Sequence, residues 1–318
     1  MAPASLGSSF GTTLAPALIE ASNGRLSDIR FFSTDWQQGG AVTAYGVFRF
    51  DDDTERDVVV KAPVGPVEHR FTTALAKAGA PTPGVAVSGV ELGAYDFAWI
   101  IIERLTGKPM SSDFKKKDLL DLSTAAAKFY HSALDSFGAP TKAPTPVDWP
   151  SLVDKARHSL RDNTIPDEQR WKEALKAVAR SLDSLVERWR ARPITFWRHG
   201  DLHPGNAMRR PADSPWGAPG CVLIDLARVT PGDWVTDAVY LERIHWGKPE
   251  LLYKQKPVKL IAKAMKQLGL DPGADYHQLA TIRRLLTAAC TPAFLEREGH
   301  PKHLAGALDA LEQSLALV

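Results

Sequence analysis

The chain of 318 residues is long enough for two modest domains or for one larger domain with two lobes. Its hydrophobic fraction of 44% and charged fraction of 24% are ordinary for a globular protein and give no sign of disorder. Lys and Arg together number 39 against 37 Asp and Glu, so the net charge gives no reason to expect a nucleic-acid partner or an acidic membrane surface.

The cysteine content and the apolar runs indicate in which cellular compartment the protein is expected. Cys221 and Cys290 lack the close spacing of a metal site and are too few for a disulfide framework. The N-terminal segment lacks the basic region and the continuous apolar run of a secretory signal. The longest apolar run, residues 98–102, is far below the roughly 20 residues that span a bilayer. We therefore expect a cytoplasmic protein without membrane insertion.

Strand signals dominate the first hundred residues. Residues 42–50 and 57–63, rich in β-branched and aromatic side chains, flank an acidic turn and predict an antiparallel hairpin. Apolar residues at helical spacing predict a helix over 67–78, which stops at a glycine. Residues 85–90 and 97–105 predict two further strands. This part of the chain should therefore form a small sheet packed with one helix.

Helical periodicity replaces the strand pattern after residue 106. The predicted helices cover residues 119–137, 171–189, 251–268, 276–289 and 303–317. The change of pattern predicts an α+β fold, with a boundary between residues 1–105 and residues 106–318. In such an arrangement a ligand often occupies the cleft between the two lobes.

The strongest chemical signal is the segment His199-Gly200-Asp201-Leu202-His203-Pro204-Gly205-Asn206. Phosphoryl transfer to a hydroxyl needs a carboxylate that orients the hydroxyl and accepts its proton, together with oxygen ligands for Mg²⁺. Asp201 and Asn206 are separated by four residues that include a Pro-Gly turn, so one rigid loop can supply both. An Asp and an Asn at this spacing alone also occur in ordinary surface turns.

The complete octet closely resembles the catalytic loop of the aminoglycoside phosphotransferase and choline kinase-like superfamily, in which His-Gly-Asp replaces the His-Arg-Asp of protein kinases. This resemblance implies a two-lobed protein kinase-like fold that uses ATP and Mg²⁺. Residues 1–105 would form the nucleotide-binding lobe, and residues 106–318 the catalytic and acceptor-binding lobe. It also implies that Asp201 is the catalytic base toward a small-molecule hydroxyl and that Asn206 is a metal ligand.

Three further features follow the catalytic loop. Asp225 ends a short apolar strand, where the resemblance implies a second Mg²⁺ ligand, although a strand-end Asp can simply start a turn. The resemblance implies that Asp237 caps a helix and braces the catalytic loop, while Asp233 could contact a substrate. Residues 209–220, rich in Pro and Gly, predict an extended hairpin loop without an assigned role.

A kinase also needs a cation that reaches the α- and β-phosphates, and a strand end holds it more rigidly than a loop. Lys61 ends an apolar strand and is a better candidate than Arg56 or Lys77, which do not. A lysine at a strand end is otherwise simply solvated. The resemblance implies that Glu68, seven residues later, is its acidic partner. Glu68 could instead be a favourable acid in the first turn of a helix.

Two weaker signals concern the nucleotide. Gly39 and Gly40 could let backbone N–H groups approach the phosphates, or could form an ordinary turn. Residues 99–107 resemble the hinge between the lobes in the same superfamily, so backbone groups at Arg104 and Leu105 would hold the adenine, and Glu103 would be structural.

The acceptor is left open by the sequence. Residues 242–269 carry seven Lys and Arg against two Glu, the opposite of the acidic wall that a polycationic aminoglycoside needs. If this surface faces the acceptor, a neutral or anionic hydroxyl compound is favoured. One alternative is a kinase of a lipid-linked or lipopolysaccharide sugar, because residues 223–228 have some likeness to such enzymes. Another is a catalytically silent nucleotide-binding regulator, but the joint presence of Lys61, Asp201, Asn206 and Asp225 argues against it.

Overall fold

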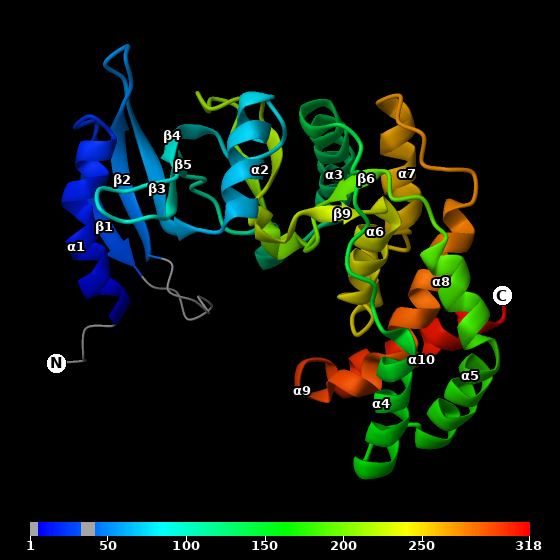
Figure 1. The fold of residues 1–318 in the computed structure, drawn as a ribbon. Coiled ribbons are helices and arrows are strands. Elements are labelled where there is room, and N and C mark those ends of the chain that lie inside the picture. Colours follow the sequence, from blue (N-terminus) through cyan, green and yellow to red (C-terminus); the bar gives the residue numbers. More distant parts are fainter. Residues whose placement is uncertain (1–5, 33–41) are drawn as a thin grey trace. The chain divides into compact units, whose positions relative to one another are not determined.

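The computed structural model describes residues 6–32 and 42–318. The chain divides into two compact units, one made of Met1–Pro109 and Ala207–Val229, the other of Met110–Asn206 and Thr230–Val318. Strands dominate the first unit and helices the second (Figure 1), which confirms the predicted α+β fold with a β-rich part and a larger helical part.

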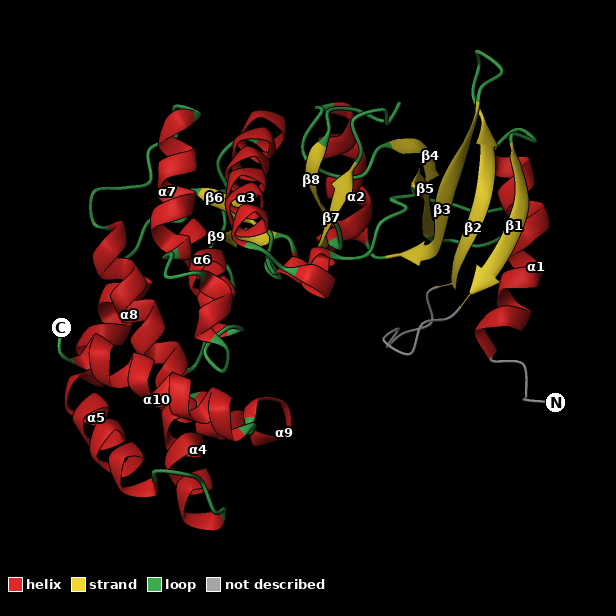
Figure 2. Cartoon of the chain, turned by 180° about the vertical axis from the view of Figure 1, so that it is seen from behind, coloured by secondary structure: helices red, strands yellow, loops and turns green. Residues whose placement is uncertain are grey.

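Five described strands of the first unit form an antiparallel sheet in the order β1-β2-β3-β5-β4 (Figure 2). Their bounds are Leu26–Phe32 (β1), Val42–Arg49 (β2), Glu55–Val64 (β3), Val85–Gly89 (β4) and Ala98–Glu103 (β5). Along β3, Val58, Val60 and Ala62 are buried, whereas Lys61 between them is only partly buried. Side chains alternate between the two faces of a strand, and Val60 and Ala62 on either side of Lys61 face the core. Lys61 therefore points to the opposite face of the sheet.

A helix that the sequence pattern did not predict, α1 (Leu6–Ala21), lies along one face of this sheet (Figure 1). Leu14 and Leu18 of α1 are buried in the same core as Trp99. Its glycines and Pro16 have low helix propensity, so the local pattern is weak. The helix is therefore stabilised mainly by burial of its apolar face against the sheet.

The first unit also contains α2 (Pro66–Lys77) and a segment from the second half of the chain. The hairpin predicted around residues 209–220 is present as β7 (Ala207–Arg210) paired with β8 (Gly220–Leu223), and the short 3₁₀ helix η3 (Leu226–Arg228) follows. Leu223 N donates to the Pro81 carbonyl at 2.7 Å, just beyond α2. This bond joins β8 to the chain that leaves the helix.

The loop of this hairpin packs on the sheet. Trp216 packs against the sheet core, and its ring meets that of Phe50 edge-on, with 5.4 Å between the centroids. The Arg56 guanidinium lies over both rings, and its Nη1 donates to the Pro215 carbonyl at 3.2 Å. The loop therefore closes part of the core of the first unit.

The second unit is mostly helical. Its helices are α3 (Lys116–Phe137), α4 (Trp149–Asp162), α5 (Glu168–Arg190), α6 (Trp234–Arg243), α7 (Pro257–Gln267), α8 (Tyr276–Ala289), α9 (Leu295–Glu298) and α10 (Pro301–Leu315). Strands β6 (Phe196–Arg198) and β9 (Thr230–Gly232) pair within it. None of the helices described from α1 to α10 is long and apolar enough to cross a lipid bilayer.

Three helices of the second unit, α4, α6 and the short α9, were not predicted, and the predicted helix over 251–268 is wrong at its start. A short 3₁₀ helix, η4 (Pro249–Leu252), occupies that region, and α7 begins only at Pro257. Proline favours the first position of a helix because it lacks the N–H that an interior position must donate. Pro257 therefore marks the start of α7 rather than its middle.

Candidate active site

The segment 199–206 lies in the second unit, directly after β6, and its backbone is held by one buried carboxylate. His199 N donates to Asp237 Oδ2 at 2.7 Å and Gly200 N to Asp237 Oδ1 at 3.1 Å. The Tyr130 hydroxyl donates to Asp237 Oδ2 at 3.1 Å. Gly200 has φ +83°, a conformation that glycine adopts without steric cost. These contacts confirm that Asp237 braces the loop.

The predicted capping role of Asp237 is wrong, because the cap of α6 is Asp233. The Asp233 side chain accepts from Val235 N at 2.7 Å, as an N-cap does. Asp237 lies one turn further along the helix, where its carboxylate faces the loop. Asp233 itself is buried, with 4% exposure, and one of its carboxylate oxygens is occupied by the cap.

Asp201 has one carboxylate oxygen anchored by the protein. The Tyr240 hydroxyl, on α6, donates to Asp201 Oδ1 at 2.7 Å, and His203 Nε2 lies 3.7 Å from the same oxygen. No donor for the second oxygen lies among the residues that the structure describes. The side chain is therefore fixed at one oxygen, and the other can accept a hydrogen bond from a bound molecule.

Asn206 closes the same loop within the 3₁₀ helix η2 (Pro204–Asn206). Its side-chain Nδ2 donates to the Asp201 carbonyl at 3.1 Å, and its backbone N donates to the His203 carbonyl at 2.9 Å. With Nδ2 turned to the loop, the side-chain oxygen Oδ1 is the atom of this amide that remains for a cation.

Lys61 and Glu68 form an ion pair within the first unit. Lys61 Nζ donates to Glu68 Oε1, and the two side chains are 29% and 13% exposed. Glu68 lies in the first turn of α2, which begins with Pro66. A proline at this position and an acid in the first turn are both typical of a helix start. Strand β3 and helix α2 thus place a partly buried cation beside a fixed carboxylate.

Asp225 follows β8 in the first unit and has an unusual backbone. Its φ of +62° and ψ of +67° lie in the left-handed region, which Asp tolerates better than most residues other than glycine. The residue is exposed, and its carboxylate accepts no hydrogen bond from the described part of the chain. Its two oxygens are free to bind a cation.

The predicted hinge is anchored through Glu103, at the end of β5. Arg210 Nε donates to Glu103 Oε1 at 2.8 Å, and Arg210 Nη2 donates to Glu103 Oε2. Gly84 N donates to the same carboxylate at 3.0 Å. Both charged side chains are buried, with 5% and 2% exposure. The structural role expected for Glu103 is confirmed, and its partner comes from β7.

Arg104 and Leu105 come next along the chain. The Arg104 guanidinium pairs with Asp57 Oδ2 at 3.2 Å and lies 4.1 Å from the centre of the Tyr45 ring. The Leu105 N–H has no acceptor among the described residues. The other predicted nucleotide contacts, Gly39 and Gly40, lie outside the described residues.

The sequence profile of the phosphotransferase enzyme family matches residues 45–297, which is most of the chain. The chain belongs to this family. It is therefore a phosphotransferase, as the resemblance of its catalytic loop implied. No curated protein sequence gives a match.

Solved structures agree in fold. A Ralstonia eutropha JMP134 protein assigned as an aminoglycoside phosphotransferase has a TM-score of 0.54 at 13% identity, over 95% of this chain and 96% of that one. An aminoglycoside phosphotransferase from Alicyclobacillus acidocaldarius gives 0.52 at 13%, over 91% and 93%. A thermostable mutant of the aminoglycoside phosphotransferase APH(4)-Ia, in a ternary complex with AMP-PNP and hygromycin B, gives 0.50 at 14%, over 96% and 98%.

Two residues that support this site were missed in the sequence. Tyr240 lies three residues after Asp237, and residues at this spacing share one helix face. With α6 recognised, the spacing could have indicated that Tyr240 faces the catalytic loop. Arg210 had no such signal, because its buried partner lies 107 residues away in the sequence.

The buried cap of α6 should make stability depend on pH. Burial raises the pKa of Asp233 from 3.8 to about 6. Between about pH 4 and pH 6 this carboxyl group is therefore protonated in the folded state and ionised in the unfolded state. Stability from this group is therefore present below about pH 4 and is lost as pH rises to about 6, by on the order of 3 kcal/mol. Asp233→Asn keeps a capping oxygen but does not titrate. In urea unfolding measured from pH 4 to 7, the free energy of unfolding of the variant should rise by this amount relative to that of the wild type.

The matched control is Asp148→Asn, which alters the exposed cap of α4, where Asp148 accepts from Ser151 N at 3.1 Å. This control should follow the wild-type profile. Parallel profiles for Asp233→Asn and wild type would contradict the role given to burial of Asp233.

Proposed function

We propose that this phosphotransferase moves the γ-phosphate of ATP to a hydroxyl group of a small molecule, with Mg²⁺ as its metal cofactor. The observation that carries the proposal is the state of Asp201, with one oxygen anchored by Tyr240 and the other without a donor in the described residues. Such a carboxylate can orient an acceptor hydroxyl and take its proton. The bonds of Asp237 to the loop backbone support this positioning, on which phosphoryl transfer largely depends.

Asn206 Oδ1 and the Asp225 carboxylate are the proposed Mg²⁺ ligands. Amide and carboxylate oxygens suit this ion, which often takes only one or two carboxylates from the protein beside substrate phosphates. No group of three or more His, Cys, Asp or Glu is placed to hold a metal within residues 6–32 and 42–318, and this kind of site needs none. Bound Mg²⁺ would neutralise charge on the phosphates. The left-handed backbone of Asp225 supports a functional constraint at this position.

The first part of the chain, residues 1–105, is proposed to bind the nucleotide, and residues 106–318 to supply the catalytic loop and the acceptor site. Lys61, held by Glu68, would contact the α- and β-phosphates. Backbone groups at Arg104 and Leu105 would hold the adenine. The contacts of Gly39 and Gly40 with phosphates stay a prediction.

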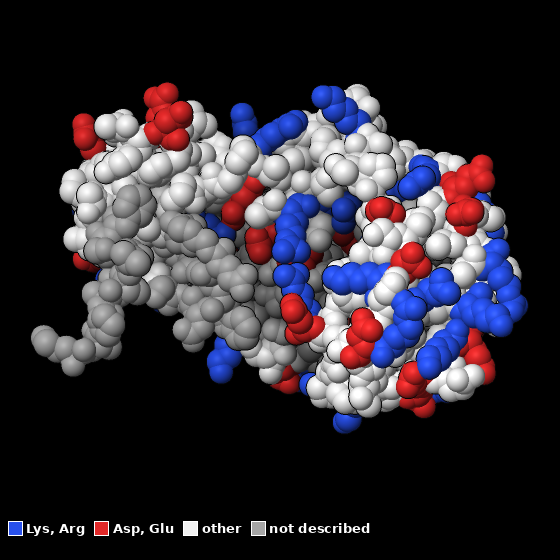
Figure 3. All heavy atoms as spheres, turned by 60° about the horizontal axis from the view of Figure 1, so that its bottom comes forward, with Lys and Arg blue, Asp and Glu red and all other residues white. Residues whose placement is uncertain are grey.

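The acceptor class can be narrowed by charge. Lys259, Lys263 and Lys266 are exposed on α7, and if this surface faces the acceptor it would repel a polycationic aminoglycoside. On the face drawn in Figure 3, Lys and Arg side chains are interspersed with Asp and Glu, so no broad acidic wall is visible there. In that arrangement a neutral or anionic hydroxyl compound is favoured. The lysines of α7 also favour, as a second candidate, a lipid-linked or lipopolysaccharide sugar with an anionic surface around it.

A γ-phosphate transfer screen tests the function. Radiolabelled ATP and Mg²⁺ would be offered with aminoglycosides, amino alcohols, sugars, nucleosides and detergent-dispersed lipid-linked sugars. We expect transfer to at least one hydroxyl compound, and no transfer without Mg²⁺. Transfer only to the dispersed lipid would select the second candidate. Binding of Mg-ATP without transfer to any class would count against the proposed small-molecule kinase activity.

Lys61→Ala should weaken nucleotide binding. A ligand that binds only the folded state raises the unfolding temperature according to its concentration and affinity. Loss of one charge-assisted contact with the phosphates should weaken Mg-ATP binding about tenfold, or about 1.4 kcal/mol, and should reduce the temperature shift. Thermal unfolding with increasing Mg-ATP measures this effect. Lys77→Ala, at an exposed lysine of α2, is the control, and equal shifts in the two variants would refute the role of Lys61.

A further inference from the structure

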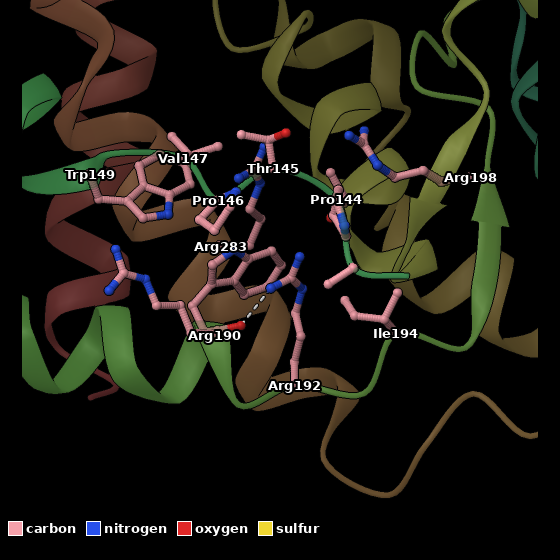
Figure 4. Close-up of a pocket in the computed structure, with 13 residues that line it drawn as sticks. Pro144, Thr145, Pro146, Val147, Trp149, Arg190, Arg192, Ile194, Arg198 and Arg283 are labelled. Carbon is pink, nitrogen blue, oxygen red and sulfur yellow. Dashed lines mark hydrogen bonds between the residues drawn. The ribbon is translucent and has the colours of Figure 1, made fainter. Parts of the chain in front are cut away.

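A cavity of about 240 Å³ lies within the helical unit, apart from the residues assigned to phosphoryl transfer (Figure 4). It is bordered by the segment that joins α3 to α4, the end of α5, strand β6 and helix α8. Four of its lining residues are arginines, and none of the described residues in its wall is Asp or Glu. The arginines are Arg190, Arg192, Arg198 and Arg283.

Two of these guanidinium groups lie over tryptophan rings. The Arg283 guanidinium carbon lies 4.9 Å from the centre of the Trp149 ring and 5.4 Å from that of Trp189. The Arg192 guanidinium carbon lies 4.0 Å from the centre of the Trp189 ring. An aromatic ring attracts a guanidinium without accepting its in-plane hydrogen bonds in the way that a carboxylate does. The tryptophans therefore hold these two groups without replacing an anionic partner.

The donors of the cluster are only partly used by the protein. Arg192 Nη1 donates to the Trp189 carbonyl at 2.6 Å, shown as the dashed line in Figure 4, but its buried Nε has no acceptor among the described residues. Neither Arg198 nor Arg283 forms an ion pair with an acid in the described chain. A buried N–H without an acceptor costs free energy, so each such group needs an explanation.

The charges of the cluster are also poorly compensated. Removal from water, followed by the repulsion of nearby arginines that include Arg198 and Arg192, lowers the pKa of Arg283 to about 9, so the group stays charged at neutral pH. The acid that acts on Arg192 is Asp233, whose carboxylate already caps α6. Arg190 is exposed, so water can solvate its charge, but water cannot reach the buried Nε of Arg192.

We propose that this pocket, lined by Arg190, Arg192, Arg198 and Arg283, binds a small molecule that carries a phosphate monoester group. The guanidinium fork matches the oxygens of phosphate, and several such groups around one cavity select a doubly charged anion. The volume is below the roughly 300–1,000 Å³ of pockets for drug-sized ligands, so the ligand is small. Its organic part would meet the apolar side of the wall, formed by Pro144, Val147 and Ile194.

The pocket adjoins the elements that hold the catalytic loop. Arg198 immediately precedes His199 in the chain, and Thr236, also in the pocket wall, immediately precedes Asp237. Because His199 N donates to Asp237, a ligand here would sit beside the bond that braces the loop. The proposal concerns only the binding of a ligand in this pocket. It can therefore be tested without nucleotide and without an acceptor.

Isothermal titration calorimetry with phenyl phosphate, in chloride buffer without Mg²⁺ or nucleotide, tests the proposal. The wild-type chain should bind this probe and should bind phenol at least tenfold more weakly. Arg192→Gln and Arg283→Met should each weaken binding at least tenfold. Arg180→Gln, at an exposed arginine of α5 outside the pocket, should bind as wild type does. Absence of wild-type binding, or equal binding by the pocket variants, would overturn the proposal.

Two further variants keep the result interpretable. Arg190→Glu reverses an exposed charge at the end of α5. It should therefore fold normally and still weaken binding even if the variants at the partly buried Arg192 and Arg283 fail to fold. Lys61→Ala should bind phenyl phosphate as wild type does. If binding is instead lost in Lys61→Ala and kept in Arg190→Glu, the probe occupies the proposed nucleotide site and the pocket assignment is wrong.

Discussion

Asp201→Asn should lower the rate of phosphate transfer by about 10²–10⁴-fold while Mg-ATP binding stays measurable. The substitution preserves the shape of the side chain and an oxygen that can accept from the Tyr240 hydroxyl. It removes the negative charge and the ability to take a proton from the acceptor. Because positioning and electrostatics dominate phosphoryl transfer, losing this one group should affect turnover far more than nucleotide affinity. Initial rates with an acceptor found by the screen, together with calorimetric titration of Mg-ATP, measure both quantities.

The control for this prediction is Asp183→Asn, which makes the same change at an exposed aspartate of α5. Its transfer rate should match that of the wild type. If the turnover of Asp201→Asn is within threefold of that of the wild type, Asp201 is not the catalytic base. A variant that neither transfers phosphate nor binds nucleotide would point instead to a general loss of structure, which its unfolding temperature would reveal.

Arg210→Met should reduce the free energy of unfolding by about 3–5 kcal/mol. The substitution leaves the Glu103 carboxylate buried, with Gly84 N at 3.0 Å and the Ser214 hydroxyl at 3.4 Å as its remaining donors. It also leaves the Thr82 carbonyl without the donor that Arg210 Nη2 supplies at 2.9 Å. A buried charge without its partner is among the most costly single changes in a protein. Urea unfolding monitored by tryptophan fluorescence would measure the loss.

The double variant Glu103→Leu/Arg210→Met removes both charges and should recover most of the stability, because burial of two apolar side chains carries no charge penalty. Arg49→Met serves as the exposed control, since the Arg49–Glu55 pair at 3.2 Å is 62% and 53% exposed and should contribute about 0–1 kcal/mol. If Arg210→Met lowers the free energy of unfolding no more than Arg49→Met does, the buried Glu103–Arg210 pair does not stabilise the packing of β7 against β5.

Much of the fold could be predicted because its signals are local. The strands around residues 42–63 alternate buried and partly buried side chains, and the long helices α3, α5, α8 and α10 repeat apolar residues at helical spacing. Helices α1 and α6 were missed for opposite reasons. Glycines and Pro16 weaken the pattern of α1, whereas α6 is buried on most sides and even its polar residues Thr236, Asp237 and Glu242 are buried, so it shows no amphipathic period.

The chemistry at the centre of the site follows from the sequence itself. Asp201 and Asn206 lie in one short loop with a Pro-Gly turn, and a loop of this length can only keep its ends close together. The pairing of Lys61 with Glu68 was implied by the family resemblance, and the short strand-to-helix connection between them allows it. In both cases the partners lie close in the sequence, so little tertiary information was needed to predict the pair.

The tertiary structure alone decided most of what supports these residues. The bracing role of Asp237 was implied by the family resemblance, but two other contacts were not. Tyr240 reaches Asp201 from 39 residues further along the chain, and Arg210 reaches Glu103 across 107 residues. The arginine pocket is assembled from several separate segments. Contacts at such separations leave no period and no fixed spacing, because packing and desolvation, rather than chain connectivity, bring the partners together. The sequence by itself therefore determined the reactive loop, and tertiary packing decided which groups hold it and which charges were left without partners.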